Sequence, residues 1–317
     1  MTTTATSTFA EEINQGLSTR PRHLSSKWFY DANGDKLFQA IMAMPEYYLT
    51  DSEREIYQTC GPALLEAIGN RPFDLIELGA GDGSKTQYLI DHFIEAGANF
   101  TYRPIDISAN AIKILGAMVA VQWPNLPFAP INDDYFAALD RLGSSNKETR
   151  RLVLFPGANI GNFTQPEAGG FLRHLKKFLR PGDLLLTGFD LKKDPDAILA
   201  AYNDPAGHTA DFNLNLLRRI NRELGGDFNL TQWRHWESYD PASGATRSFL
   251  VSRSEQDITI KALDKTFSFD AWEAISVEIS QKYSKREIET LAQDAGFTHQ
   301  SHFQDERGWF SDSLWLV

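Results

Sequence analysis

The sequence predicts an α/β protein built on a doubly wound, mostly parallel β-sheet, joined to a second domain of α+β character. Three observations indicate this fold. A glycine-rich loop at residues 79–83 separates an apolar strand from a helical pattern. Further strand and helix patterns then alternate, which is typical of a parallel sheet covered on both faces. Residues 193–282 do not fit this alternation and are inserted before the last helix and strands.

The glycine-rich loop has the sequence Glu77-Leu78-Gly79-Ala80-Gly81-Asp82-Gly83. Glycine has no Cβ, so such a loop lets a ligand approach the backbone closely. The spacing differs from that of the dinucleotide fingerprint and of the P-loop. It resembles motif I of the class I S-adenosylmethionine-dependent methyltransferases, which implies a Rossmann-like sheet and S-adenosylmethionine as cofactor. The alternative is a generic glycine turn of an α/β protein.

Acidic residues follow the next two predicted strands. Asp106 ends the second strand, where a carboxylate can accept hydrogen bonds from both hydroxyls of a ribose. Its alternative role is to cap the helix that begins at residue 109, which Ser108 could equally do. In methyltransferases the loop after the third strand presents an acid to the adenine amino group. Asp134 and Tyr135 fit that role, and Asp133 competes with Asp134 for it.

The fourth strand, residues 151–155, is apolar after Arg151, as a buried parallel strand should be. Ligands of open α/β sheets bind outside the carboxyl ends of the strands, so the loop at 156–164 should face the substrate. Its Asn162 offers donors and an acceptor that suit the carboxylate or amine of an amino acid. The loop lacks the D/N-P-P-Y/F/W sequence of nucleobase amino methyltransferases, which argues against a nucleic-acid substrate.

The inserted segment predicts a helix at 206–224 followed by strands at 231–239, 246–253 and 257–263 that form an antiparallel sheet. A Ser-capped helix from residue 284 and strands at 299–304 and 313–317 then complete the first domain. We therefore expect a discontinuous substrate-binding domain, residues 1–58 with 193–282. Residues 59–192 with 283–317 would form the cofactor-binding domain.

Composition restricts the function further. The net charge of −11 and the pI near 5.1 argue against binding to a phosphate backbone. A single cysteine, Cys60, excludes intramolecular disulfides and a cysteine-based zinc site, and we predict no metal site. No signal-like segment and no apolar run of membrane-spanning length occur, so we expect a cytoplasmic protein. We predict no protein partner, and a monomer is compatible with the sequence.

Four stretches are similar to the ergothioneine-pathway histidine Nα-methyltransferases, and the likeness runs from about residue 20 to the C-terminus. They are Lys27-Trp28-Phe29-Tyr30-Asp31, Pro45-Glu46-Tyr47-Tyr48, Ile160-Gly161-Asn162 and Val277-Glu278-Ile279-Ser280. That family transfers three methyl groups from S-adenosylmethionine to the α-amine of L-histidine and produces hercynine.

The resemblance implies a role for each matching residue. Cofactor contacts would come from Gly79, Lys85, Asp106, Asp134 and Tyr135, and substrate contacts from Tyr47, Asn162, Tyr202, Glu278 and Ser280. Tyr30 and Phe38 would lie near the reacting amine. Tyr30 and Tyr47 are the catalytic candidates, because the amine must lose a proton before each transfer and aromatic faces tolerate the quaternary ammonium that forms.

One position departs from the family pattern. Phe249 aligns with a methionine of the family, and as a predicted substrate-binding residue it would alter the side-chain pocket. This departure keeps open a methyltransferase for another aromatic amino acid or amine. Glu278 favours an imidazole over an indole, because its carboxylate can accept an imidazole N–H. A catalytically inactive S-adenosylmethionine-binding protein is the remaining alternative.

Overall fold

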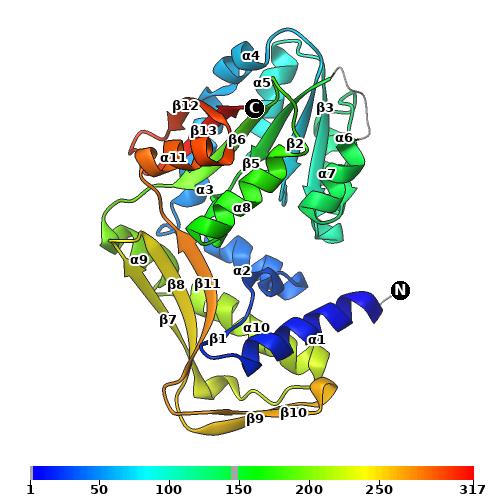
Figure 1. The fold of residues 1–317 in the computed structure, drawn as a ribbon. Coiled ribbons are helices and arrows are strands. Elements are labelled where there is room, and N and C mark those ends of the chain that lie inside the picture. Colours follow the sequence, from blue (N-terminus) through cyan, green and yellow to red (C-terminus); the bar gives the residue numbers. More distant parts are fainter. Residues whose placement is uncertain (1–2, 144–148) are drawn as a thin grey trace. The chain divides into compact units, whose positions relative to one another are not determined.

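The computed structural model describes residues 3–143 and 149–317 (Figure 1). Its contacts divide the chain into two compact units: unit 1 is Met1–Tyr48 with Lys193–Ser280, and unit 2 is Leu49–Lys192 with Gln281–Val317. The predicted boundary after residue 58 is thereby corrected to Tyr48. Helix α3 (Leu49–Thr59) packs against α5 and β13 of unit 2, and its Ile56 and Tyr57 are buried there.

Unit 2 contains a seven-stranded sheet with the strand order β12-β13-β6-β5-β2-β3-β4. The strands β2 to β6 pair in parallel, whereas β13 runs antiparallel to both of its neighbours, β6 and β12. This confirms the predicted doubly wound sheet with a terminal hairpin. The strand bounds are β2 Phe73–Leu78, β3 Phe100–Asp106, β4 Ile131–Asn132, β5 Arg150–Phe155, β6 Leu184–Asp190, β12 Thr298–Gln304 and β13 Phe310–Leu316.

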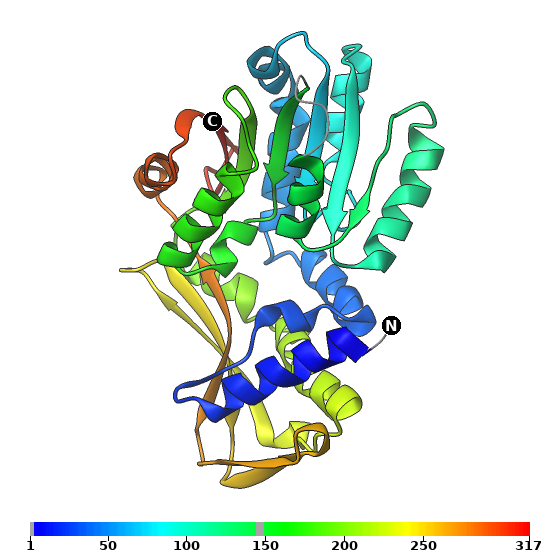
Figure 2. The same cartoon turned by 45° about the vertical axis from the view of Figure 1, so that its right-hand side comes forward.

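Helices cover both faces of this sheet (Figures 1 and 2). On the face toward the viewer in Figure 1, α7, α8 and α11 bury Leu139, Leu172 and Ile288 in one core with Val153 and Trp315. Helices α3, α4 and α5 cover the opposite face, where Phe93 of α5 contacts the rings of Phe73 and Phe100. The helices are α4 Gly61–Ile68, α5 Gln87–Glu95, α6 Ala109–Gln122, α7 Tyr135–Gly143, α8 Gln165–Lys176 and α11 Lys285–Ala295.

Unit 1 contains a four-stranded sheet with the order β1-β11-β8-β7 and a separate hairpin of β9 and β10. The predicted antiparallel pairing is confirmed for β7 with β8. The sequence did not predict β1, which joins the sheet edge in parallel with β11. The strands are β1 Arg22–His23, β7 Trp233–Asp240, β8 Ala245–Ser252, β9 Gln256–Ile260, β10 Lys265–Phe269 and β11 Ala274–Gln281.

The helices of unit 1 come from both of its segments: α1 Thr3–Ser18, α2 Ala32–Met42, α9 Pro195–Tyr202 and α10 His208–Leu224. Residues Phe9 and Ile13 of α1 share a core with Phe212 and Leu216 of α10 and with Ile275 of β11. Short 3-10 helices occur at Ser26–Phe29, Asn159–Asn162 (η2), Leu230–Gln232 and Lys261–Leu263. Within residues 3–143 and 149–317, no helix is both long and apolar enough to span a membrane.

Candidate active site

In unit 2, three predicted cofactor residues and the predicted substrate residue Asn162 lie along one edge of the sheet. Gly79 follows β2, Asp106 ends β3, Asp134 follows β4, and Asn162 lies in η2, which follows β5. Because β2 to β5 are parallel, their carboxyl ends lie along the same edge, where open α/β sheets bind ligands. Asn162 is exposed at this edge.

Gly79 lies beside the aromatic ring that follows β4. Its φ of 75° is in the left-handed region, and a Cβ at this position would lie 2.8 Å from the hydroxyl oxygen of Tyr135. Burial, together with the nearby Asp106 carboxylate, raises the pKa of Tyr135 well above its usual range. The structure therefore brings Gly79, Asp106 and Tyr135 together, and Tyr135 keeps its hydroxyl proton.

Hydrogen bonds around Asp106 show which residue caps α6. Ser108 caps α6, because its hydroxyl accepts a hydrogen bond from the Ala111 N–H at 3.2 Å. Asp106 instead accepts hydrogen bonds from the Gly81 N–H at 2.9 Å and the Ser108 N–H at 2.8 Å, one on each oxygen. Each oxygen keeps a second lone pair, so the carboxylate is held in place and can still accept bonds from two hydroxyls.

The two acids that compete for the adenine contact, Asp133 and Asp134, have different partners. Asp133 uses one oxygen for the Asp134 N–H at 2.9 Å and pairs through the other with Arg141. Asp134 caps α7 with Oδ1, which accepts from the N–H groups of Phe136 and Ala137 at 3.0 and 3.1 Å. The exposed Asp134 keeps Oδ2 outside the cap, so it is the better acceptor for an amino group.

Lys85 pairs with an acid, Glu53, that the sequence did not indicate. It forms an ion pair with Glu53 of α3, whose side chain is fully buried, and the Lys85 side chain is 20% exposed. The other oxygen of Glu53 accepts the Gly157 N–H at 2.7 Å, so Glu53 also holds the loop after β5. Glu53 is one acid near the start of a polar helix, and no pattern in the sequence indicates that it pairs with Lys85. The Lys85 ammonium keeps further donors for a ligand.

Two more buried carboxyl groups lie near Lys85. Glu77 accepts hydrogen bonds from the hydroxyls of Thr86 and Tyr102, both at 2.5 Å, and burial raises its pKa to about 7. Burial and the neighbouring Glu53 raise the pKa of Asp312, on β13, well above its usual range. Lys85 therefore lies among three buried carboxyl groups, those of Glu53, Glu77 and Asp312, and its positive charge partly offsets their negative charge.

In unit 1, the predicted substrate residues form a connected aromatic series. The ring of Tyr30 lies 5.7 Å from that of Phe38, and Phe38 lies 6.3 Å from Tyr47. Tyr47 lies 6.4 Å from Tyr202 of α9, and the Tyr202 hydroxyl is 2.9 Å from that of Ser280 on β11. Segments far apart in the sequence thus bring Tyr30, Tyr47, Tyr202 and Ser280 together.

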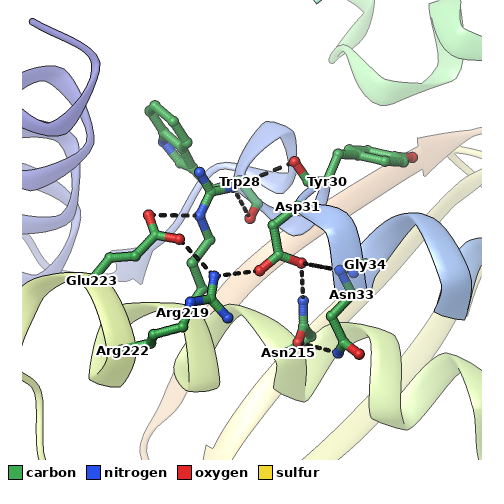
Figure 3. Close-up of polar contacts among 9 residues, drawn as sticks. All are labelled: Trp28, Tyr30, Asp31, Asn33, Gly34, Asn215, Arg219, Arg222 and Glu223. Atoms are coloured by element: carbon green, nitrogen blue, oxygen red, sulfur yellow. Dashed lines mark hydrogen bonds and ion pairs between the residues drawn. The ribbon is translucent and has the colours of Figure 1, made fainter. Parts of the chain in front are cut away.

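The backbone around Tyr30 is fixed by α10 (Figure 3). Arg219 donates hydrogen bonds to the carbonyls of Trp28 and Tyr30 at 3.0 and 3.5 Å. Asp31 caps α2 through the N–H groups of Asn33 and Gly34, and it also accepts from Asn215 and pairs with Arg222. Figure 3 shows the Tyr30 ring pointing away from the Asp31 carboxylate. Tyr30 is 38% exposed.

Glu278 lies beside Ser248, the neighbour of Phe249 on β8. The Ser248 hydroxyl is 3.4 Å from a Glu278 oxygen and donates to Glu237 at 2.6 Å. Neighbouring residues of a strand point to opposite faces, so Phe249 faces away from Glu278. It pairs instead with Trp236 of β7. Ser248 is the residue of β8 whose hydroxyl lies next to Glu278, and a role for Phe249 in the side-chain pocket stays a prediction.

The likeness to known proteins covers most of the chain. The histidine N-alpha-methyltransferase of Mycolicibacterium smegmatis is 35% identical over 303 residues, which cover 96% of this chain and 93% of that protein. Ergothioneine biosynthesis protein 1 of Schizosaccharomyces pombe is 28% identical over 93% of this chain and 38% of that protein. The L-tryptophan methyltransferase of Psilocybe serbica is 27% identical over 94% of this chain and 90% of that protein. A family model described as "Histidine-specific methyltransferase, SAM-dependent" matches residues 9–317, and the chain belongs to this family of S-adenosylmethionine-dependent enzymes.

Proposed function

We propose that this enzyme transfers methyl groups from S-adenosylmethionine to the α-amine of L-histidine, up to the trimethylated product hercynine, as a step of ergothioneine biosynthesis. The observation that carries the proposal is the set of polar groups around Glu278 on β11. A carboxylate and the hydroxyls of Ser248 and Ser280 lie on one sheet beside the aromatic series. They offer an imidazole partners for both of its nitrogens.

The residues at the sheet edge of unit 2 fit the cofactor. No Cβ intrudes at Gly79, and Asp106 keeps lone pairs for the two ribose hydroxyls. We assign Asp134 to the adenine amino group and Lys85 to the cofactor carboxylate. When bound, S-adenosylmethionine supplies an electrophilic methyl group on its sulfonium.

In unit 1, we assign the α-carboxylate of histidine to Tyr202, whose hydroxyl is a donor. In unit 2, Asn162 stays a proposed substrate contact, because its amide offers both donors and an acceptor. Fixing the carboxylate directs the amine lone pair, and near-attack positioning of this kind contributes a large part of the rate of a displacement reaction. The Ser280 hydroxyl restrains the Tyr202 hydroxyl at 2.9 Å, so this donor is already oriented.

Tyr30 and Tyr47 remain our catalytic candidates. The amine loses a proton before each transfer, and with each methyl group it becomes bulkier, until the third leaves a permanent cation. The faces of the aromatic series stabilise a cation without forming a hydrogen bond that a fully methylated nitrogen could not donate.

The test is mass spectrometry of the purified enzyme incubated with S-adenosylmethionine and an equimolar mixture of the twenty amino acids. We expect a gain of three methyl groups on histidine alone. Methylation of tryptophan or another amino acid instead would overturn the substrate assignment and leave the family and cofactor in place. A chain that binds S-adenosylmethionine but methylates no amino acid would overturn the proposed reaction.

A further inference from the structure

A second cluster of chemically active side chains lies in unit 2, on α11 and β12. The imidazoles of His299 and His302 lie with ring centroids 4.2 Å apart, and Glu289 approaches them from α11. One ligand atom from each of the three residues lies within 4.8 Å of the others. The proposed methyl transfer uses none of these residues.

The geometry of β12 is adapted to this arrangement. Residues three apart on a regular strand point to opposite faces. The pairing of β12 with β13 shifts register between His299 and Ser301, where Gln300 is an extra residue. Such a bulge re-aims the side chains that follow it, so His299 and His302 both lie on the face toward Glu289.

Both histidines have a buried Nε2 atom. Within residues 3–143 and 149–317, the Nε2 of His299 has no hydrogen-bond partner, whereas the Nε2 of His302 faces the Glu289 carboxylate. Buried polar atoms of this kind are rare and call for an explanation such as an absent ion or water. The His302 Nδ1 lies 3.3 Å from the hydroxyl of Ser311 on β13. If Nδ1 carries the proton and donates it there, the lone pair of Nε2 points at Glu289.

The distance between His302 and Glu289 is close to that between two ligands of one metal ion. His302 Nε2 lies 3.5 Å from a carboxylate oxygen of Glu289. Two ligands bound tetrahedrally to Zn²⁺ at about 2.0 Å are separated by about 3.3 Å. The Ser311 contact corresponds to the outer hydrogen bond that usually orients a metal-bound imidazole. Lys285, one turn before Glu289 on α11, is exposed, so solvent screens the repulsion between its charge and a bound dication.

We infer that Glu289, His299 and His302 form a binding site for a divalent transition metal ion, for which Zn²⁺ has the matching ligand preference. Two imidazoles and one carboxylate provide three ligands, and the exposed side of Glu289 leaves the fourth position to water. The ion would link α11 to β12, whose contact otherwise depends on the apolar side chains of the helix. It would act on the stability of unit 2, and methyl transfer would not require it.

The test measures metal binding by the untagged protein, since a polyhistidine tag would mask the result. Dialysis against Zn²⁺ should leave one ion per chain, and Co²⁺ should give the intense visible bands of four-coordinate cobalt. Saturating Zn²⁺ should also raise the Tm by several degrees, because an ion that binds the native state alone stabilises it.

Matched variants separate this site from adventitious binding. His299→Ala and His302→Ala should each lose the bound ion and the Tm rise, whereas His174→Ala, on the exposed surface of α8, should retain both. Glu289→Gln keeps the side-chain volume on an exposed helix position and should weaken Zn²⁺ binding at least tenfold. Retention of the ion by the two histidine variants, or no stoichiometric ion in the wild type, would overturn the inference.

Discussion

The hydroxyl of Ser248 lies 3.4 Å from the carboxylate of Glu278, across the boundary between β8 and β11. Because Ser248 also donates to the buried Glu237, it holds two acids near the proposed imidazole site. We expect Ser248→Val to raise the KM for histidine about tenfold, the effect of losing one buried hydrogen bond of about 1.4 kcal/mol. Steady-state kinetics would measure it.

Phe249→Leu is the control for this prediction. Its side chain faces away from Glu278, so the KM for histidine should stay within about twofold of the wild-type value. A larger change in KM for Phe249→Leu than for Ser248→Val would contradict the placement of the pocket.

Glu278 should carry much of the affinity for histidine. Removing its carboxylate leaves an imidazole N–H without an acceptor, so Glu278→Ala should weaken histidine binding by about 1–3 kcal/mol. Isothermal titration calorimetry would measure this loss, with Glu11→Ala on the exposed surface of α1 as the control. Unchanged histidine affinity in Glu278→Ala would refute the assignment of the imidazole to this residue.

The ion pair of Glu53 with Lys85 should stabilise the fold strongly. Glu53→Gln leaves Lys85 without its closest counter-charge in a buried setting, and we expect the free energy of unfolding to fall by about 3 kcal/mol. Asp51→Asn, on the same helix but 71% exposed, should lower it by less than about 0.5 kcal/mol. Urea denaturation would measure both, and equal losses would show that burial of Glu53 has no energetic consequence.

Glu77 should make stability depend on pH. Its pKa is raised by burial to about 7 from 4.5, so the native state holds a proton that the unfolded chain releases in this interval. The contribution of Glu77 to the free energy of unfolding is fully present below about pH 4.5 and is lost as the pH rises through 7. The total loss is on the order of 3 kcal/mol. Glu77→Gln lacks this loss, so its stability relative to the wild type should improve between pH 5 and pH 8. Parallel urea midpoints across that range would contradict the prediction.

Asp31 should act mainly as a helix cap. Asp31→Ala removes the acceptor for the N–H groups of Asn33 and Gly34 and should cost about 1–2 kcal/mol of stability. Asp31→Asn keeps a capping oxygen and loses only the ion pair with the half-exposed Arg222, so it should cost less than about 0.5 kcal/mol. Thermal unfolding would compare the two variants, and equal losses would assign the effect to the charge.

Local patterns in the sequence were sufficient for most of the fold. The glycine loop, the apolar run at Leu152–Phe155 and the Ser284 cap each carry their own signal, and each lies where it was predicted. What depends on distant contacts could not be predicted. Strand β1 is two residues long and exists only because β11 lies beside it. The first boundary moved to Tyr48 because α3 packs on β13, which is encoded far along the chain.

The same distinction applies to the candidate sites. Gly79 and Asp106 follow strands, so the edge on which they lie could be predicted from their positions. Glu53 gave no such signal, because its role depends on Lys85 and on the loop after β5. The sequence did not indicate Ser248, although it lies next to Glu278, and in a strand a shift of one residue exchanges the two faces. His299 and His302 share a face of β12 only because of a bulge that could not be predicted from the sequence.

The interleaved course of the chain has a consequence for its synthesis on the ribosome. The core of unit 1 needs both Phe9 and Ile275, and the sheet of unit 2 needs β13, which ends at Leu316. Domains encoded in one continuous segment can fold while the rest of the chain is still being made. Here unit 1 cannot close before β11 has been translated, and unit 2 cannot close before β13, so the nascent polypeptide exposes the apolar strands β2, β5 and β6 to chaperones until β13 is made.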